Sequence, residues 1–249
     1  MFNFDKKYLY IILGVFVLFN IYDRLTNQTS LLTLILTLPA ILLAITFHEF
    51  AHAFAADKLG DETPRNQGRL TLNPLKHIDP VGFALLIVAG FGWGKPVQVN
   101  PYRFKRDISM TKAEAIVSFA GPLMNLILAI LSAMFLTSII KFNLFTNLSS
   151  QVYSLILIFL IQFCTINIGL CIFNLIPLPP LDGSKILYHF ISEDKKEWFI
   201  RNEQILHIVF LGIWVTGLAG KIITPCIRGV LKGIFFIVGK LFNIDIGLM

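Results

Sequence analysis

Long apolar stretches alternate with short polar ones along this chain. Six stretches are apolar over most of their length: 8–22, 31–56, 113–140, 151–176, 204–220 and 222–243. About 20 mostly apolar residues make a helix that crosses a bilayer, so these stretches predict transmembrane helices. The first is short, but no small-residue cleavage site follows it, and we expect it to be retained. The pattern predicts an all-α polytopic membrane protein with about six spans.

The polar stretch 57–112, between the second and third spans, has a different pattern. Its many prolines and glycines exclude a long helix. Residues 69–73 and 96–100 alternate apolar and polar side chains, which predicts two short strands. Residues 81–91 are apolar but too few to span, so we expect them to dip into the membrane or lie along it. The stretch is therefore predicted to be a short β-containing segment.

Composition and charge agree with a membrane location. Hydrophobic residues make up 55% of the chain, and the mean hydropathy is +0.73. The net charge of +6 is spread over loops instead of one basic run, which argues against nucleic acid as a partner. Many of the basic residues fall within 57–112, and basic loops stay cytoplasmic. This stretch and the amino terminus are therefore both predicted to be cytoplasmic.

The second predicted span carries the sequence HEFAH at positions 48–52. His48 and His52 are one helical turn apart, so both imidazoles can reach one zinc ion. Glu49 directly follows the first histidine. In His-Glu-x-x-His metalloproteases the glutamate at this position is the general base. Chance alone gives about 0.002 such matches in a chain of this composition. Three ionisable side chains inside a span also need a compensating partner, which a divalent cation supplies.

Two histidines leave a catalytic zinc ion without the third protein ligand that it normally has. By residue type, the candidates are His77, His189 and His207. Asp182 is more suggestive, because it follows a proline-rich run that ends the fourth span on the same predicted side of the membrane as the histidines.

Five motifs occur in order between about residues 46 and 190. They are HEFAH at 48–52, NPLKHIDPVG at 73–82, GWGKPV at 92–97, AGPLMN at 120–125 and NLIPLPPLDG at 174–183. In these motifs the chain resembles the site-2 proteases, the intramembrane zinc metalloproteases of peptidase family M50. The resemblance implies one zinc ion per chain, bound by His48, His52 and Asp182, with Glu49 as general base. It also implies a three-helix catalytic core made of spans two to four.

The resemblance further implies a domain organisation and a location. We expect one membrane-embedded protease domain over 1–249, with a catalytic core of about 31–190 and flanking spans at 8–22, 204–220 and 222–243. No interruption fits a PDZ domain and no extension resembles a CBS domain, which corresponds to the minimal form of the family. The expected location is a prokaryotic cell membrane, with the active site toward the cytoplasm.

Two asparagines in the family-like motifs are candidate substrate-binding residues. Asn125 and Asn174 could donate to the tetrahedral oxyanion or hold the substrate backbone. Interhelical hydrogen bonding is an equally good interpretation of both. A transmembrane substrate must be locally unwound before cleavage, and we expect the strand at 69–73 or at 97–100 to pair with it.

Three other functions compete with proteolysis of transmembrane segments. A catalytically inactive pseudoprotease could bind transmembrane clients, but it would not need Glu49 beside the ligands. A protease that trims prenylated proteins and a transporter with a zinc site are the other two. The aspartate-containing motif at 174–183 argues against both of them.

Overall fold

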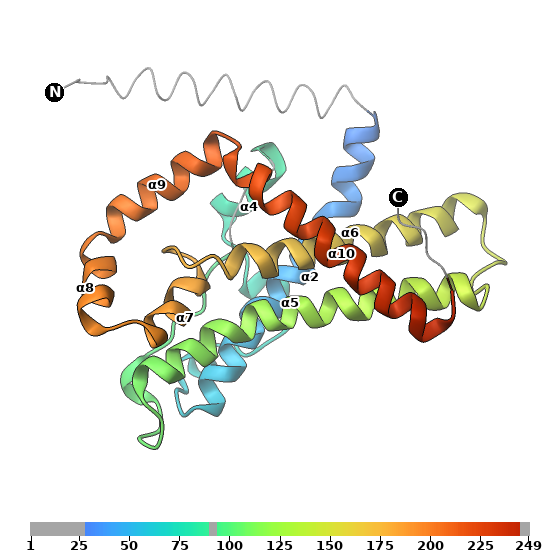
Figure 1. The fold of residues 1–249 in the computed structure, drawn as a ribbon. Coiled ribbons are helices and arrows are strands. Elements are labelled where there is room, and N and C mark those ends of the chain that lie inside the picture. The colour runs from blue at the N-terminus through green and yellow to red at the C-terminus, as the bar shows by residue number, and fades with distance from the viewer. Residues whose placement is uncertain (1–27, 90–93, 245–249) are drawn as a thin grey trace.

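The computed structural model describes residues 28–89 and 94–244, and within these ranges the fold is helical (Figure 1). The long helices are α2 (Gln28–Lys58), α5 (Met110–Lys141), α6 (Ser150–Asn174) and α10 (Leu218–Phe242). The short helices are α3 (Thr63–Asn66), η1 (Pro74–Lys76), α4 (Pro80–Ala89), η2 (Pro101–Arg103), α7 (Asp182–Phe190), α8 (Glu193–Arg201) and α9 (Glu203–Val215).

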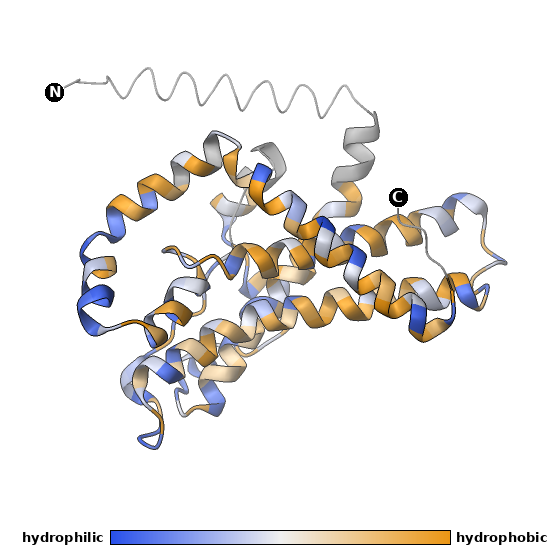
Figure 2. Cartoon of the chain, in the orientation of Figure 1, coloured by the Kyte–Doolittle hydropathy of each residue, from blue (hydrophilic) through white to orange (hydrophobic). Residues whose placement is uncertain are grey.

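Four helices in the described part of the chain are long and apolar enough to cross a membrane. These candidate spans are Ile35–Lys58, Met110–Lys141, Ser150–Asn174 and Leu218–Phe242. They confirm the predicted helical membrane protein and correspond to four of the six apolar stretches. Figure 2 shows their mostly hydrophobic colouring, in contrast to the hydrophilic residues of α8.

Two of the six predicted spans are not among these four candidates. The stretch 8–22 lies outside the described residues. The prediction of a continuous span over 204–220 is wrong, because α9 has 13 residues and ends at Val215. Gly217 then adopts a left-handed backbone conformation, with φ of 72°, before α10 begins. Since a span needs about 20 residues, α9 is too short to cross by itself.

The two predicted strands are also wrong: the described residues contain no β-strand. Residues 96–100 have no regular secondary structure, and the nearest approach to a sheet among the described residues is one isolated antiparallel bridge between Ile78 and Gly94. The buried side chain of Arg69 connects the two segments instead. Its guanidinium donates hydrogen bonds to the carbonyl oxygens of Lys76, Lys95 and, at 3.1 Å, Pro96. Burial lowers the pKa of Arg69, and the negative charge of Glu49 offsets part of that effect.

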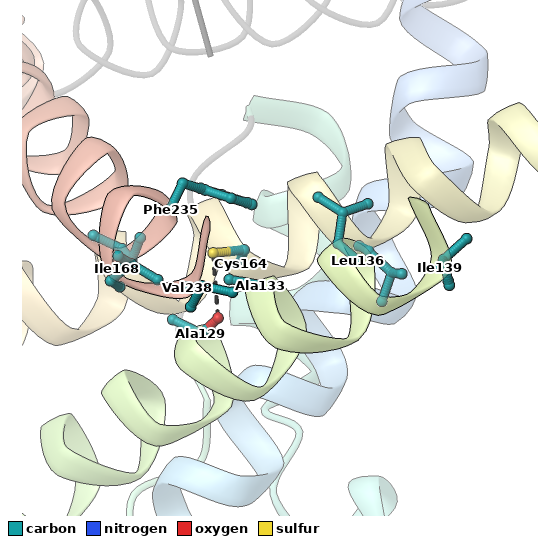
Figure 3. Packing of buried hydrophobic residues seen from close by; sticks show 10 residues of the cluster. Ala129, Ala133, Leu136, Ile139, Cys164, Ile168, Phe235 and Val238 are labelled. Atoms are coloured by element: carbon teal, nitrogen blue, oxygen red, sulfur yellow. Dashed lines mark hydrogen bonds between the residues drawn. The ribbon is translucent and has the colours of Figure 1, made fainter. Parts of the chain in front are cut away.

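The three helices α2, α5 and α6 all contact one another, and α10 packs on α5 and α6. Figure 3 shows the core between α5, α6 and α10, with Ala129 and Ala133 from α5 facing Cys164 of α6. Small side chains let transmembrane helices approach closely. Two hydrogen bonds cross the α5–α6 contact here: Cys164 Sγ donates to Ala129 O at 3.4 Å, and Ser132 Oγ donates to Leu160 O at 2.8 Å.

Candidate metal centre

Helix α2 presents two histidines to the interior of the helix bundle. His48 and His52 are 7% and 8% exposed. They lie one turn apart on the helix, and their Nε2 atoms are 3.0 Å from each other. The rings meet edge to face, with an interplanar angle of 87°. The two Nε2 atoms therefore point at the same small volume.

Asp182, at the start of α7, brings a carboxylate to this volume. Its Oδ2 atom lies 3.2 Å from Nε2 of His48 and 3.2 Å from Nε2 of His52. Burial acts to raise the pKa of the Asp182 carboxyl, but the two histidines hold it well below its ordinary range. The next residue is a glycine because the loop after α6 folds back over it. A Cβ atom at Gly183 would lie 2.4 Å from the carbonyl oxygen of Ile176.

The hydrogen bonds of the two imidazoles show which nitrogen of each ring faces the carboxylate. Nδ1 of His48 lies 2.6 Å from Oδ1 of Asn125, and Nδ1 of His52 lies 2.7 Å from the carbonyl oxygen of Val117. Both partners are acceptors, so both Nδ1 atoms carry a proton. The Nε2 atom of each ring is therefore the one turned toward Asp182, and it is the atom that can bind a metal once it is deprotonated.

The three residues fit a zinc ion. They form a group that can hold a metal, with ligand atoms within 4.8 Å of one another. Ligand atoms bound to tetrahedral zinc at about 2.05 Å are about 3.3 Å apart, close to the 3.0–3.2 Å found here. Two imidazoles and one carboxylate are also a usual donor set for catalytic zinc.

Gly121 on α5 makes this arrangement possible. A Cβ atom at this position would lie 2.4 Å from Nε2 of His52 and 2.6 Å from Cε1 of His48. The imidazoles therefore pack directly on the backbone of α5, where any side chain would displace them. The motif AGPLMN contains this glycine, but the sequence alone does not show that the two histidines of α2 pack against it.

A cleft of about 180 Å³ opens beside the metal-binding group. Its lining includes His48, Glu49, His52, Val97, Asn174 and Asp182. Glu49 is half-buried, and its Oε2 atom accepts a hydrogen bond of 2.9 Å from the backbone N–H of Val97. The segment 96–100 therefore contributes to the wall of the cleft and holds Glu49 in place. Arg69, which fixes this segment, was not identified from the sequence, because a lone arginine in a basic loop gives no signal.

The two candidate asparagines lie in different surroundings. Asn174 is half-buried at the cleft, and its Nδ2 donates to the carbonyl oxygen of Leu170 at 3.0 Å. Asn125 is fully buried and hydrogen-bonds to His48 instead of lining the cleft. Its surroundings correspond to the interhelical interpretation.

The other histidines do not join the metal-binding group. His77 is fully buried, and its Nε2 donates to the carbonyl oxygen of Thr71 at 2.8 Å. Burial lowers its pKa, which favours the neutral ring. His207 pairs with Glu203 on its own helix, at 3.7 Å, and His189 stacks edge to face on Phe190. Of the four candidates for the third ligand, the structure brings only Asp182 to His48 and His52.

Fold and site together define a helical membrane protein with two buried histidines and a half-buried aspartate that could hold a metal ion beside a cleft. Residues 150–216 match Peptidase family M50. The chain is 38% identical over 193 residues to a protein of Bacillus subtilis named "Putative zinc metalloprotease YwhC", a match that covers 76% of this chain and 84% of that protein. The chain belongs to peptidase family M50, which confirms the resemblance.

Mycobacterial relatives are similar over a shorter range. "Putative zinc metalloprotease Rip2" of Mycolicibacterium smegmatis is 34% identical over 152 residues, 60% of this chain and 54% of that protein. The Rip2 protein of Mycobacterium tuberculosis is 28% identical over 155 residues. No solved structure matches the chain significantly.

Proposed function

We propose that this protein is an intramembrane zinc metalloendopeptidase that cleaves transmembrane segments of other membrane proteins. The observation that carries the proposal is the convergence of two histidine Nε2 atoms and one carboxylate beside Glu49 in one cleft. His48, His52 and Asp182 would hold one zinc ion. When bound, zinc supplies Lewis-acid chemistry, since it polarises the scissile carbonyl and makes a water molecule more acidic.

The chain's own residues supply proton transfer and orientation. Glu49 takes the proton of the attacking water and delivers it to the leaving amine. The N–H of Val97 keeps one of its carboxylate oxygens fixed, so the other is available for the proton. Asn174, at the cleft, is the candidate donor to substrate. A binding protein without catalysis would have no use for an oriented carboxylate at this point.

The position of the histidines suggests where the substrate is cut. His52 precedes the end of the candidate span Ile35–Lys58 by six residues, or about 9 Å along the helix. Since the basic stretch 57–112 follows directly, we place this end toward the cytoplasm. Cleavage is therefore expected near the cytoplasmic end of the substrate helix, within a catalytic core of about 31–190 in a single domain.

The segment 96–100 is our candidate for receiving the unwound substrate. It lines the cleft without belonging to a strand, and its backbone groups can pair with an extended peptide. The substitution Val99→Pro removes one backbone N–H, and Val99→Ala is the matched control. We expect Val99→Pro to slow cleavage of a transmembrane substrate while zinc content stays at the wild-type level. Equal rates for the two variants would exclude pairing at this N–H.

The principal test compares Glu49→Gln and His52→Ala with the wild-type protein in detergent or vesicles. We expect Glu49→Gln to bind zinc and lose cleavage of a panel of single-span substrates, whereas His52→Ala loses both. The control is Glu62→Gln, a change to a glutamate outside the cleft. Cleavage by Glu49→Gln at the wild-type rate would contradict the proposed role of Glu49, and wild-type protein without zinc would contradict the metal assignment.

A further inference from the structure

A chain of hydrogen bonds leads from His48 away from the cleft to helix α6. Oδ1 of Asn125 accepts from Nδ1 of His48 at 2.6 Å. Nδ2 of Asn125 donates to the carbonyl oxygen of Ala44 at 3.1 Å and to Oδ1 of Asn167 at 2.8 Å. Nδ2 of Asn167 donates to the carbonyl oxygen of Phe163 at 2.8 Å. Three helices, α2, α5 and α6, thus meet in one polar network.

The main-chain partners determine the orientation of both amides. A carbonyl oxygen only accepts, so the atom of Asn167 that faces Phe163 is the amide nitrogen, and its oxygen must face Asn125. By the same reasoning, the nitrogen of Asn125 faces Ala44 and Asn167, and its oxygen faces His48. Asn125 and Asn167 are both fully buried, so water does not supply alternative partners.

The orientation of Asn125 decides where His48 carries its proton. With the oxygen toward the ring, the proton stays on Nδ1 and the lone pair of Nε2 faces His52 and Asp182. If the amide turned over, its N–H₂ group would face Nδ1 and favour the tautomer with the proton on Nε2. That proton would occupy the direction in which a metal must bind.

His48 differs in this respect from the other histidine. Nδ1 of His52 donates to the carbonyl oxygen of Val117, which belongs to the backbone of α5 and cannot turn over. The partner of His48 is a side-chain amide, whose two ends are nearly the same size. Two acceptors hold Asn125 in its orientation: the backbone carbonyl oxygen of Ala44 at 3.1 Å and Oδ1 of Asn167 at 2.8 Å. The bond to Asn167 is the shorter of the two.

We infer that Asn167 is a positioning residue for the metal centre. Together with the carbonyl oxygen of Ala44, it keeps Asn125 in the orientation that holds the proton of His48 on Nδ1 and leaves Nε2 free for zinc. Asn167 is fully buried and outside the cleft lining, so contact with substrate does not explain it. The inference rests on the zinc site of the proposed function and adds a residue outside all five family-like motifs.

The test compares Asn167→Ala with Ser132→Ala. Each substitution removes one buried side-chain hydrogen bond between α5 and α6, but Ser132 bonds to Leu160 and has no connection to His48. We expect Asn167→Ala to weaken zinc binding about 2- to 10-fold, the effect of one net hydrogen bond on the amide orientation. Ser132→Ala should stay within about twofold of the wild type. Competition with a chelator measures both affinities.

The tautomer of His48 gives a second readout that is independent of catalysis. Nitrogen NMR of metal-free protein labelled at histidine separates protonated from bare ring nitrogens, and His48→Gln assigns the signals. We expect Asn167→Ala to increase the Nε2-protonated form of His48 and to leave His52 unchanged. A loss of packing alone would not move this signal.

Two further variants cover rescue and failure to fold. Asn167→Asp keeps an oxygen toward Asn125 and, with its buried carboxyl group protonated, can still donate to the carbonyl oxygen of Phe163, so it should retain more zinc affinity than Asn167→Ala. If Asn167→Ala does not accumulate, Asn167→Ser takes its place, since serine can bond within its own helix but does not reach Asn125.

The outcomes separate the two proposals. Zinc affinity and a His48 tautomer equal to those of Ser132→Ala would overturn the positioning role while leaving the zinc site intact. Wild-type protein that binds no zinc, or whose zinc binding is insensitive to His48→Ala, would instead overturn the metal assignment, and the positioning role with it.

Discussion

Replacing Gly121 with alanine is the sharpest test of the packing around the metal-binding group. The added Cβ atom would lie 2.4 Å from Nε2 of His52, whereas ordinary van der Waals contact begins at 3.4 Å. The imidazole must therefore move by about 1 Å, or α2 and α5 must separate by a similar amount. Zinc sites tolerate ligand displacements of about 0.2 Å, so the required shift is about five times too large.

The same shift also breaks the support of His52. Its Nδ1 donates to the carbonyl oxygen of Val117 at 2.7 Å, and about 1 Å more would exceed hydrogen-bonding distance. Loss of such a supporting bond by itself typically costs 10- to 100-fold in metal affinity. We therefore expect Gly121→Ala to lose at least about 100-fold in zinc affinity and to lose cleavage with it.

The expected loss of zinc affinity in Gly121→Ala would not result from a less stable helix. Alanine is favoured over glycine inside a helix by about 1 kcal/mol, so α5 itself does not suffer from the change. Gly229→Ala on α10 is the matched control, because a Cβ atom there has no heavy atom within 4 Å. Zinc content, chelator competition and thermal unfolding are measured on both variants. A Gly121→Ala protein that keeps one zinc ion at wild-type affinity would refute the close packing of α5 against the imidazoles.

Four further changes have defined outcomes. Gly183→Ala should weaken zinc binding as well, because its Cβ atom would meet the carbonyl oxygen of Ile176 at 2.4 Å and shift the neighbouring aspartate; unchanged chelator competition would contradict this. Arg69→Lys should slow cleavage and speed limited proteolysis near residue 95, with zinc content unchanged, because lysine cannot replace the guanidinium bonds to three carbonyl oxygens. Asp61→Asn should lower the free energy of unfolding by about 1–3 kcal/mol, since this fully buried carboxylate accepts a hydrogen bond from the N–H of Asn100 at 2.6 Å, and an amide supplies one acceptor fewer. Removal of metal with a chelator should abolish cleavage and lower the unfolding temperature, and added zinc should restore both.

The sequence was informative where local spacing decides the structure. Two histidines four residues apart share a helix face in any α-helix, so the predicted neighbourhood of His48 and His52 followed from helix geometry. The candidate spans followed from the length of the apolar stretches. Asp182 could be proposed because it follows a run of closely spaced prolines at 177–180, which a helix cannot accommodate. These arguments need no knowledge of how the helices pack.

The sequence misled where a local pattern has two structural outcomes. The alternation at 96–100 suggested a strand, but the segment has no regular secondary structure. The side chain of Arg69 binds the carbonyl oxygens of Lys95 and Pro96, and no strand lies beside the segment among the described residues. The apolar stretch 204–220 suggested one span, but Gly217 interrupts it with a left-handed conformation. The hydropathy of a segment indicates whether its side chains favour an apolar environment. It does not show whether the backbone continues as one helix.

What the sequence by itself determined is therefore the chemistry that the chain can offer: a His-Glu-x-x-His helix, an aspartate after a broken helix, and apolar spans to carry them. Only the tertiary structure decided which acceptors face the two Nδ1 atoms, why position 121 has no side chain, and that Asn167 lies in the hydrogen-bond network behind His48. His48 and Asn125 are 77 residues apart, and Asn125 and Asn167 are 42 apart. Contacts over such separations are set by the packing of α2, α5 and α6, because each depends on the depth and rotation of two helices at once.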